Sequence, residues 1–99
     1  MNTLSLSVIS ANKIFFQGRC ISVTLPASDG EKAFMAHHEE MAIAIVPGKM
    51  RIRLEDDSVI EACISNGLAD CANNRVKVIA FEIEKPEEWD KIREMENWE

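Results

Sequence analysis

The stretch Thr3-Leu-Ser-Leu-Ser-Val-Ile9 alternates apolar and polar residues, and this alternation decides the fold class of the chain. Successive side chains of a β-strand point to opposite faces, so a period of two predicts a strand with one face buried. Outward from this stretch, the same alternation returns in residues 20–25, 50–54 and 75–82. The pattern predicts a mainly β protein.

Turn-forming residues separate the apolar runs at short intervals, because Gly and Asn tolerate positive φ and Pro presets φ near −65°. No helical segment lies between the runs, and parallel strands in one sheet need long crossovers. The spacing therefore favours an antiparallel sandwich or barrel. The predicted strands cover residues 3–9, 13–17, 20–25, 33–36, 41–46, 50–54, 59–64, 68–72 and 75–82.

The composition fits one folded domain without nucleic acid as a partner. The chain has 99 residues, 46% of them apolar and 28% charged, which suffices for one core but not for two. Its net charge of −6 has the wrong sign for binding phosphates or anionic lipid. Neither a membrane span nor an export signal is expected. Three cysteines without a C-x-x-C pair predict buried reduced thiols: Cys20, Cys63 and Cys71.

The period changes after residue 84, where a short helix is predicted over residues 85–99. Pro86 suits a first helical position, and acidic residues fill the first turn, where the helix dipole favours them. About 14 helical residues are marginally stable alone, so the apolar stripe is expected to dock on the sandwich or on a neighbouring chain. The stripe recurs every three residues: Trp89, Ile92, Met95 and Trp98.

The segment His37-His38-Glu39-Glu40 is the one cluster with the residue types of a metal site. Adjacent residues on a strand point to opposite faces, so both imidazoles would reach one ion only from an irregular loop with distant ligands. A small cupin-like metal-binding β-protein is therefore an alternative function, and a solvated loop is the simpler interpretation. The four glycines form neither a P-loop nor a dinucleotide fingerprint, so neither catalytic residues nor a cofactor is expected.

A basic stripe is predicted on one strand face, because Lys49, Arg51 and Arg53 alternate with apolar residues. Such a stripe is either solvated or placed against an acidic partner subunit. A free-standing β-sandwich adaptor is a further alternative, although the immunoglobulin type lacks support here. The chain has no Tyr and no pair of cysteines framing a Trp.

Several segments follow one another in a recognisable order: Ser28-Asp-Gly-Glu31, His38, Val46-Pro-Gly48, Arg51-Ile-Arg-Leu54, Ile64-Ser-Asn-Gly67 and Asn74-Arg-Val-Lys-Val78. Together they resemble the epsilon subunit of F-type ATP synthases. Members of that family typically read S-E-G-E-L-G-I-x-P-G-H-A-P-L, then K-P-G-x-x-R-I, L-S-G-G-x-L-E-V and N-x-V-T-V-L. The opening of the chain is similar to the family's start at Leu6-Ser-Val-Ile9 and Phe16-Gln-Gly18.

The resemblance implies a ten-stranded antiparallel β-sandwich over residues 1–84, followed by a short C-terminal helix. It also implies a non-catalytic rotor subunit that packs on the gamma subunit and the c-ring and couples proton flow to ATP synthesis. Such a subunit lies peripherally on the cytoplasmic side of a bacterial cell membrane. The matching positions are Ser10, His38, Met41 and Ile43 at the gamma interface, and Ser28 and Glu31 at the c-ring. Beside His38, an exposed apolar patch is expected from Met41, Ile43 and Ile45.

The chain departs from the family pattern in one loop and in length. Ala36-His37 stands where the family has Pro-Gly, and Glu39-Glu40 stands where it has Ala-Pro. The family continues into a helical hairpin that can block ATP hydrolysis, of which residues 85–99 resemble a remnant. A helix of that length extends only about 21 Å, too short to reach the catalytic head. No ATP binding is therefore expected.

Overall fold

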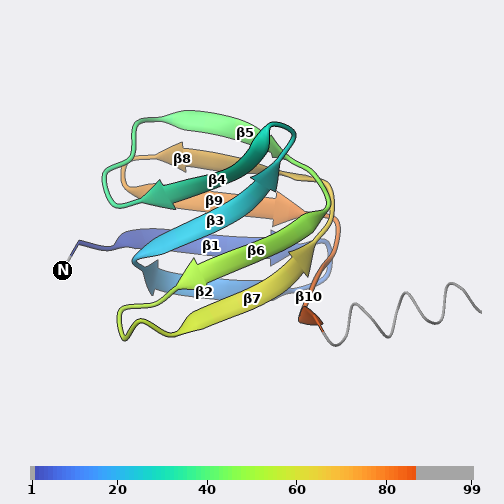
Figure 1. Cartoon of the computed structure of the whole chain (residues 1–99), viewed down its shortest axis with the longest axis horizontal. Helices are drawn as coiled ribbons and strands as arrows, with labels where there is room; N and C mark the ends of the chain where they lie inside the picture. Colours follow the sequence, from blue (N-terminus) through green and yellow to red (C-terminus); the bar gives the residue numbers. More distant parts are fainter. Residues whose placement is uncertain (1, 87–99) are drawn as a thin grey trace, which may run out of the picture.

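Two five-stranded sheets stack to form a β-sandwich in the computed structural model, which describes residues 2–86 (Figure 1). Sheet A has the strand order β2-β1-β9-β8-β5, and sheet B has the order β10-β7-β6-β3-β4. The predicted β-sandwich is therefore confirmed. The strands are β1 (Leu4–Ser10), β2 (Ile14–Cys20), β3 (Ser22–Ala27), β4 (Gly30–Met35), β5 (Met41–Ile45), β6 (Gly48–Arg53), β7 (Val59–Ile64), β8 (Gly67–Ala72), β9 (Arg75–Ala80) and β10 (Ile83–Glu84).

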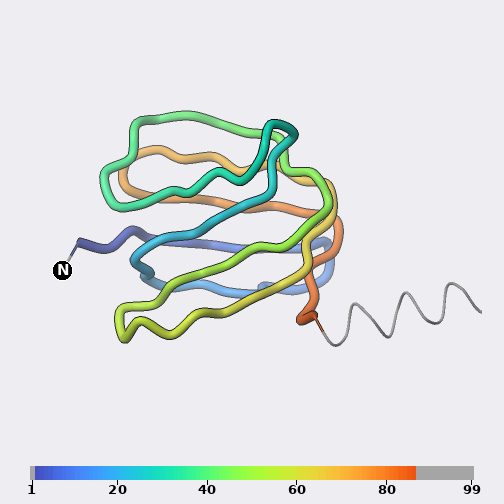
Figure 2. The backbone as a smooth tube through the Cα atoms, viewed as in Figure 1, coloured from blue at the N-terminus to red at the C-terminus, as the bar shows by residue number. Residues whose placement is uncertain are grey.

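One strand pairing contradicts the expectation that all strands are antiparallel. β1 pairs with β9 in parallel, from Ser5 opposite Arg75 to Ser10 opposite Ala80. A parallel pair needs a long connection, and here the strands β2 to β8 supply it in place of a crossover helix. The tube in Figure 2 shows this path: the blue first strand and the orange ninth strand run side by side in the same direction.

The core lies between the sheets and is built from the inward residues of the alternating runs. β1 shows the pattern most simply, because Leu4, Leu6 and Val8 are buried while the residues between them are half-exposed. The other buried apolar side chains of the described residues are Cys20, Val23, Leu25, Phe34, Ile45, Met50, Ile52, Ala62, Ile64, Ala69, Cys71, Val76, Val78, Ala80 and Ile83.

The predicted strand 75–82 ends two residues early, at Ala80, and a short further strand that was not predicted follows in the other sheet. β9 ends at Ala80, the chain crosses at residues 81–82, and Ile83 of β10 pairs with Ile64 in sheet B. The crossing is held by the β7–β8 loop: the Ser65 hydroxyl accepts a hydrogen bond from the Glu82 amide at 2.8 Å, and the Ser65 amide donates to the Glu82 carbonyl at 3.0 Å. These local bonds replace the ladder that a continuous strand would make.

The loop Asn73-Asn74 joins β8 to β9 as a two-residue hairpin. Both residues have positive φ, 54° and 59°, as a type I′ turn requires. Asn adopts this left-handed conformation at low cost, because its short polar side chain can bond locally. The turn predicted at these residues is confirmed.

No disulfide joins Cys20, Cys63 and Cys71, and two of the three are buried as predicted. Burial raises the pKa of the Cys20 thiol to about 11, because the thiolate would lose its hydration. Cys71 is also buried, whereas Cys63 is half-exposed.

The predicted C-terminal helix lies almost wholly outside the described residues, so its docking residues Trp89, Ile92, Met95 and Trp98 are not described. Within residues 2–86, no helix has the length and apolarity needed to cross a bilayer.

Replacing Gly67 by Ala should destabilise the fold, because a Cβ at this position would lie 2.2 Å from the Ile79 carbonyl oxygen and 2.8 Å from the Ala80 Cα. Both atoms belong to the backbone of β9, so the strand itself must move. The expected loss is about 1–3 kcal/mol in the free energy of unfolding, measured by urea denaturation.

Gly18→Ala is the matched control. Its new Cβ would meet only the Phe16 ring, at 3.7 Å, which is ordinary contact. Gly18→Ala should leave stability unchanged or raise it by up to about 1 kcal/mol. Equal effects of the two substitutions would contradict the close approach of β8 and β9.

Candidate functional site

The outer face of sheet A carries an apolar row that crosses all five strands. The registers place Ile14 beside Ile9, Ile9 beside Ile79 and Leu68 between Ile79 and Ala44. Neighbouring strands lie about 4.8 Å apart, so the row is about 19 Å long. We call these five residues the apolar row: Ile14, Ile9, Ile79, Leu68 and Ala44.

The apolar row is largely open to solvent. The exposed fractions are 61% for Ile14, 52% for Ile79 and 64% for Leu68, and the neighbouring Phe81 is 73% exposed. A shallow cleft of about 390 Å³ lies at the strand ends and is lined by Ser10, Leu68, Ile79 and Phe81, among others. Contiguous apolar surface on a small domain usually marks an interface.

The outer face of sheet B is polar and partly satisfied by its own charges. The Arg51 guanidinium binds the Glu31 carboxylate through both nitrogens, at 3.0 and 3.1 Å. The hydrogen bond and the charge of Arg51 lower the pKa of Glu31 below its ordinary value of 4.5. The same partner raises the pKa of Arg51. The centre of the predicted basic stripe is therefore neutralised within the fold.

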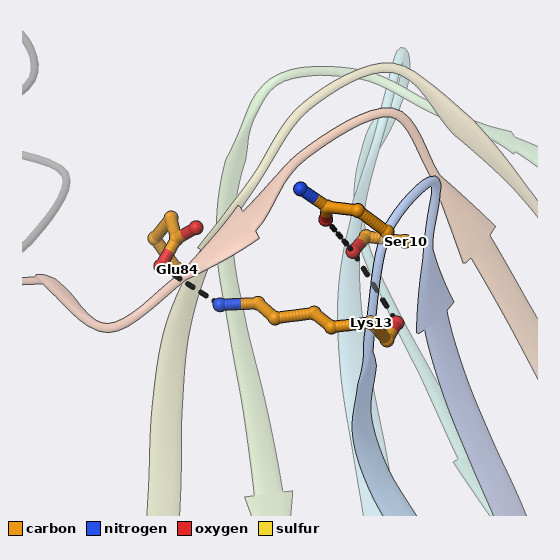
Figure 3. A network of polar contacts seen from close by, with 4 residues as sticks. Ser10, Lys13 and Glu84 are labelled. Atoms are coloured by element: carbon orange, nitrogen blue, oxygen red, sulfur yellow. Dashed lines mark hydrogen bonds and ion pairs between the residues drawn. The ribbon is translucent and has the colours of Figure 1, made fainter.

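Ser10 lies at the β1–β2 turn, where Figure 3 shows its polar contacts, and it lines the cleft beside Leu68 and Ile79. The residue is buried, and its hydroxyl lies 3.3 Å from both the Asn12 side-chain oxygen and the Lys13 carbonyl oxygen. In the same network the Lys13 ammonium binds the Glu84 carboxylate at 2.9 Å, which ties this turn to β10. Ser10 therefore shapes the end of the row and uses its own hydroxyl within the turn.

Met41 and Ile43 do not form the exposed patch that the sequence led us to expect. Both are half-buried and pack against the core, and Ile45 is buried with 3% exposure. Their side chains share the inward face of β5, so Ala42 and Ala44 point outward. A period of two identifies the two faces of a strand but not which of them is inside.

The loop that carries His37 and His38 is held in place by Asn74. The His37 backbone has φ of 60°, and its amide donates to the Asn74 side-chain oxygen at 2.8 Å. The Asn74 amide nitrogen donates in turn to the Thr3 carbonyl at 3.0 Å. We call these two bonds the Asn74 clasp, which joins the β4–β5 loop to the start of β1.

His38 lies apart from Ser10, at the opposite end of the sandwich. The Asn74 clasp places its loop where β9 begins, whereas Ser10 pairs with Ala80 where β9 ends. The His38 ring packs edge-on against Phe34, with ring centroids 5.0 Å apart, and its Nδ1 lies 2.9 Å from the Glu39 carbonyl oxygen. Across residues 2–86, no three His, Cys, Asp or Glu side chains gather as a metal site would require. The described geometry does not support the cupin-like alternative.

Ser28 and Glu31 lie around the β3–β4 turn. Ser28 and Asp29 are exposed at the tip, and Gly30 closes the turn with φ of 118°, a conformation that favours glycine. Glu31 follows on β4 with 54% of its side chain exposed, although it is paired with Arg51. The turn therefore presents a polar, acidic tip.

Sequence reasoning missed the apolar row. The signal was present, because Ile9, Leu68 and Ile79 interrupt the polar positions of three alternating strands. That these interruptions line up became visible only from the strand registers.

Residues 3–86 match the family described as the β-sandwich domain of the ATP synthase delta/epsilon chain. The chain belongs to this ATP synthase delta/epsilon family.

Relatives in the family include proteins named ATP synthase epsilon chain. The one from Caldicellulosiruptor bescii is 33% identical over 93 residues, covering 94% of this chain and 67% of the relative. The chloroplastic one from Piper cenocladum is 30% identical, covering 84% of this chain and 62% of the relative. The delta/epsilon chain described here thus spans about two thirds of the length of such relatives.

A solved structure shares the fold. A chain in the mitochondrial ATP synthase of Euglena gracilis, in a structure of OSCP, F1 and the c-ring, matches with a TM-score of 0.85 at 20% identity. The match covers 96% of this chain and 62% of that chain.

Replacing Asn74 by Ala should loosen the altered loop of this family member, because both bonds of the Asn74 clasp are lost. Asn73→Ala is the matched control, since Asn73 also has positive φ but makes no side-chain hydrogen bond to the described residues. Asn74→Ala should cost about 1–3 kcal/mol more than Asn73→Ala in urea unfolding. If both substitutions lowered the free energy of unfolding equally, the turn conformation alone, and not the Asn74 clasp, would account for the loss.

The Glu31–Arg51 pair predicts a pH dependence of stability. The pKa of Glu31 is lower in the folded state than its ordinary value of 4.5. The pair therefore stabilises the fold fully at pH values above 4.5, and this stabilisation is lost as the pH falls through the lowered pKa. Wild type should therefore be more stable than Glu31→Gln at neutral pH, and the gap should close on acidification, as measured by urea midpoints. Glu61 lies opposite Arg51 on the neighbouring strand β7, and no hydrogen bond between the two side chains is present. The stability difference between wild type and Glu61→Gln should therefore be smaller. A gap of constant size in acid would exclude the pair as its cause.

Proposed function

We propose that this chain is a non-catalytic rotor subunit of the central stalk of a proton-translocating F-type ATP synthase. Membership of the delta/epsilon family and relatives named ATP synthase epsilon chain support this role. The subunit works by contact: it transmits torque between proton flow and nucleotide chemistry carried out elsewhere. It therefore needs two separate binding surfaces on one rigid body.

The apolar row is the observation that carries the proposal, and we assign it to the gamma subunit. An isolated sandwich gains nothing from a line of exposed apolar side chains across one face, whereas burying it against a partner removes this surface from water. Ser10 borders the row and belongs to this contact. Met41 and Ile43 lie on β5, the edge strand that ends the row at Ala44, and support it from within. His38 lies in the loop before β5, so a contact of gamma with His38 extends the proposed interface toward the end of the sandwich opposite Ser10.

The acidic β3–β4 tip is the proposed contact with the c-ring. Ser28 is exposed, and about half of the Glu31 side chain is exposed. The ion pair with Arg51 holds the Glu31 carboxylate in one orientation. A polar tip suits the polar loops of a membrane-embedded ring. In this arrangement the subunit belongs to a membrane-associated complex and lies peripherally, on the cytoplasmic side of a bacterial membrane.

A pull-down with the gamma subunit of its own synthase tests the proposal directly. The wild-type chain should retain gamma, with the c-ring joining the complex when it is added. A folded chain that retains neither subunit would refute the rotor assignment.

Leu68→Asp should weaken gamma binding at least about tenfold, because a carboxylate would be buried without a partner in the middle of the apolar row. The fold should survive, since Leu68 points outward and is 64% exposed. Val59→Asp is the matched control: Val59 is 48% exposed on sheet B, where no gamma contact is proposed. Titration of gamma against both variants checks this, and equal affinities would exclude the row as the interface.

A further inference from the structure

A polar trough lies on the outer face of sheet A, directly beside the apolar row. Its floor is formed by Ser5 and Ser7 of β1, and its walls by Gln17 of β2 and by Arg75 and Lys77 of β9. The hollow has a volume of about 380 Å³. The strands that form it, β2, β1 and β9, are adjacent in Figure 1. We call this feature the cationic trough.

The donors of the trough have no partner among the described residues. Arg75 and Lys77 are exposed and make no ion pair within residues 2–86, and the hydroxyls of Ser5 and Ser7 make no hydrogen bond there. Arg19, next to the trough, is different: its guanidinium already donates to the Thr3 hydroxyl at 2.8 Å and to the Thr3 carbonyl at 3.2 Å. The trough therefore offers hydroxyls, an ammonium and a guanidinium that are open to solvent and to an external acceptor.

The outer faces of sheet A and sheet B differ in how their charged side chains are paired. On the outer face of sheet A, Asp70 is the one carboxylate at the outward register positions; it stands opposite Lys77 without forming an ion pair. On sheet B, by comparison, Arg51 is engaged by Glu31 through two bonds. Sheet B also carries the exposed cations Lys49 and Arg53, but on sheet A the open positive charge of Arg75 and Lys77 lies in a hollow beside the apolar row.

We infer that the trough binds carboxylates of the gamma subunit, so that gamma must present acidic side chains next to the apolar ones that cover the row. This inference rests on the proposed function and specifies its partner surface. Continuity supports it: Ser7 and Lys77 lie two positions before Ile9 and Ile79 on the same strands, about 7 Å away. A surface that covers the row therefore also reaches the trough. The charges set the orientation of the partner and the rate of association more than the affinity.

A protein carboxylate fits better than the other anions that could reach a cationic surface. Nucleic acids and anionic membranes present extended negative fields, which the net charge of −6 repels at long range. A few carboxylates on a docked protein interact at short range, where Arg75 and Lys77 dominate. Arg75 can hold one carboxylate with two parallel hydrogen bonds.

The test is a charge reversal, Arg75→Glu with Lys77→Glu, and the measurement is gamma binding by biolayer interferometry at two salt concentrations. The double variant should bind gamma about tenfold more weakly at about 50 mM NaCl, mainly through slower association. At about 300 mM NaCl the difference should shrink, because salt screens exposed charges. Asp70→Asn, which removes the competing carboxylate, should speed association.

The matched control is Lys49→Glu with Arg53→Glu, which reverses two exposed cations on the outer face of β6 in sheet B. It changes the net charge equally, so a general charge effect would weaken both double variants to the same degree and overturn the inference. Leu68→Asp separates the two proposals. If Leu68→Asp abolishes binding while the trough variant binds like wild type, the trough assignment fails and the rotor function stands. If wild type itself does not bind gamma, both fail.

Vesicles of anionic phospholipid and single-stranded RNA serve as the competing probes. Neither should bind the wild-type chain more tightly than it binds the double variant. Binding of either probe that depends on Arg75 and Lys77, together with unchanged gamma binding, would assign the trough to another class of partner and overturn the inference.

Discussion

The parallel pairing of β1 with β9 is the constraint on which the rest of the sandwich depends. It joins the first hairpin to the ninth strand and so completes sheet A. Its register is fixed by burial, because Leu6 meets Val76 and Val8 meets Val78 on the inward face. A slip by one residue would move these side chains to solvent and bring the serines of β1 into the core. The Asn74 clasp secures the start of this pair at Thr3.

The same pairing creates the surface that we assign to a partner. Once Leu6 and Val8 are inside, Ser5, Ser7 and Ile9 must point outward, and Ile9 falls beside Ile79. The apolar row and the cationic trough are therefore two consequences of one register. On sheet B the central cation, Arg51, is engaged by Glu31 within the fold, whereas Arg75 and Lys77 on sheet A make no ion pair within residues 2–86. The two outer faces of one small domain thus differ in chemistry, as expected for a subunit that contacts its neighbours in fixed directions.

The loop that departs most from the family pattern has a structural explanation. His37 takes a left-handed conformation, and its amide is satisfied by the Asn74 side chain, while the His38 ring packs on Phe34. Each histidine is thus positioned by local packing and hydrogen bonding. Two neighbouring histidines in a sequence suggest a metal site, but the described geometry directs them to different contacts.

The sequence by itself determined roughly where β1 to β9 lie and which side chains share a face, because both follow from the local period of two. Leu4, Leu6 and Val8 were predictable as one buried face, and Asn73-Asn74 as a tight turn, from residue chemistry alone. Tertiary structure decided which face is inside on β5, where Met41 and Ile43 turned inward. It also decided the parallel pairing, the crossing of β10 into sheet B and the alignment of Ile9, Ile79 and Leu68 into one row. These features depend on contacts between residues far apart in the chain, and a local period carries no information about which distant strand becomes a neighbour.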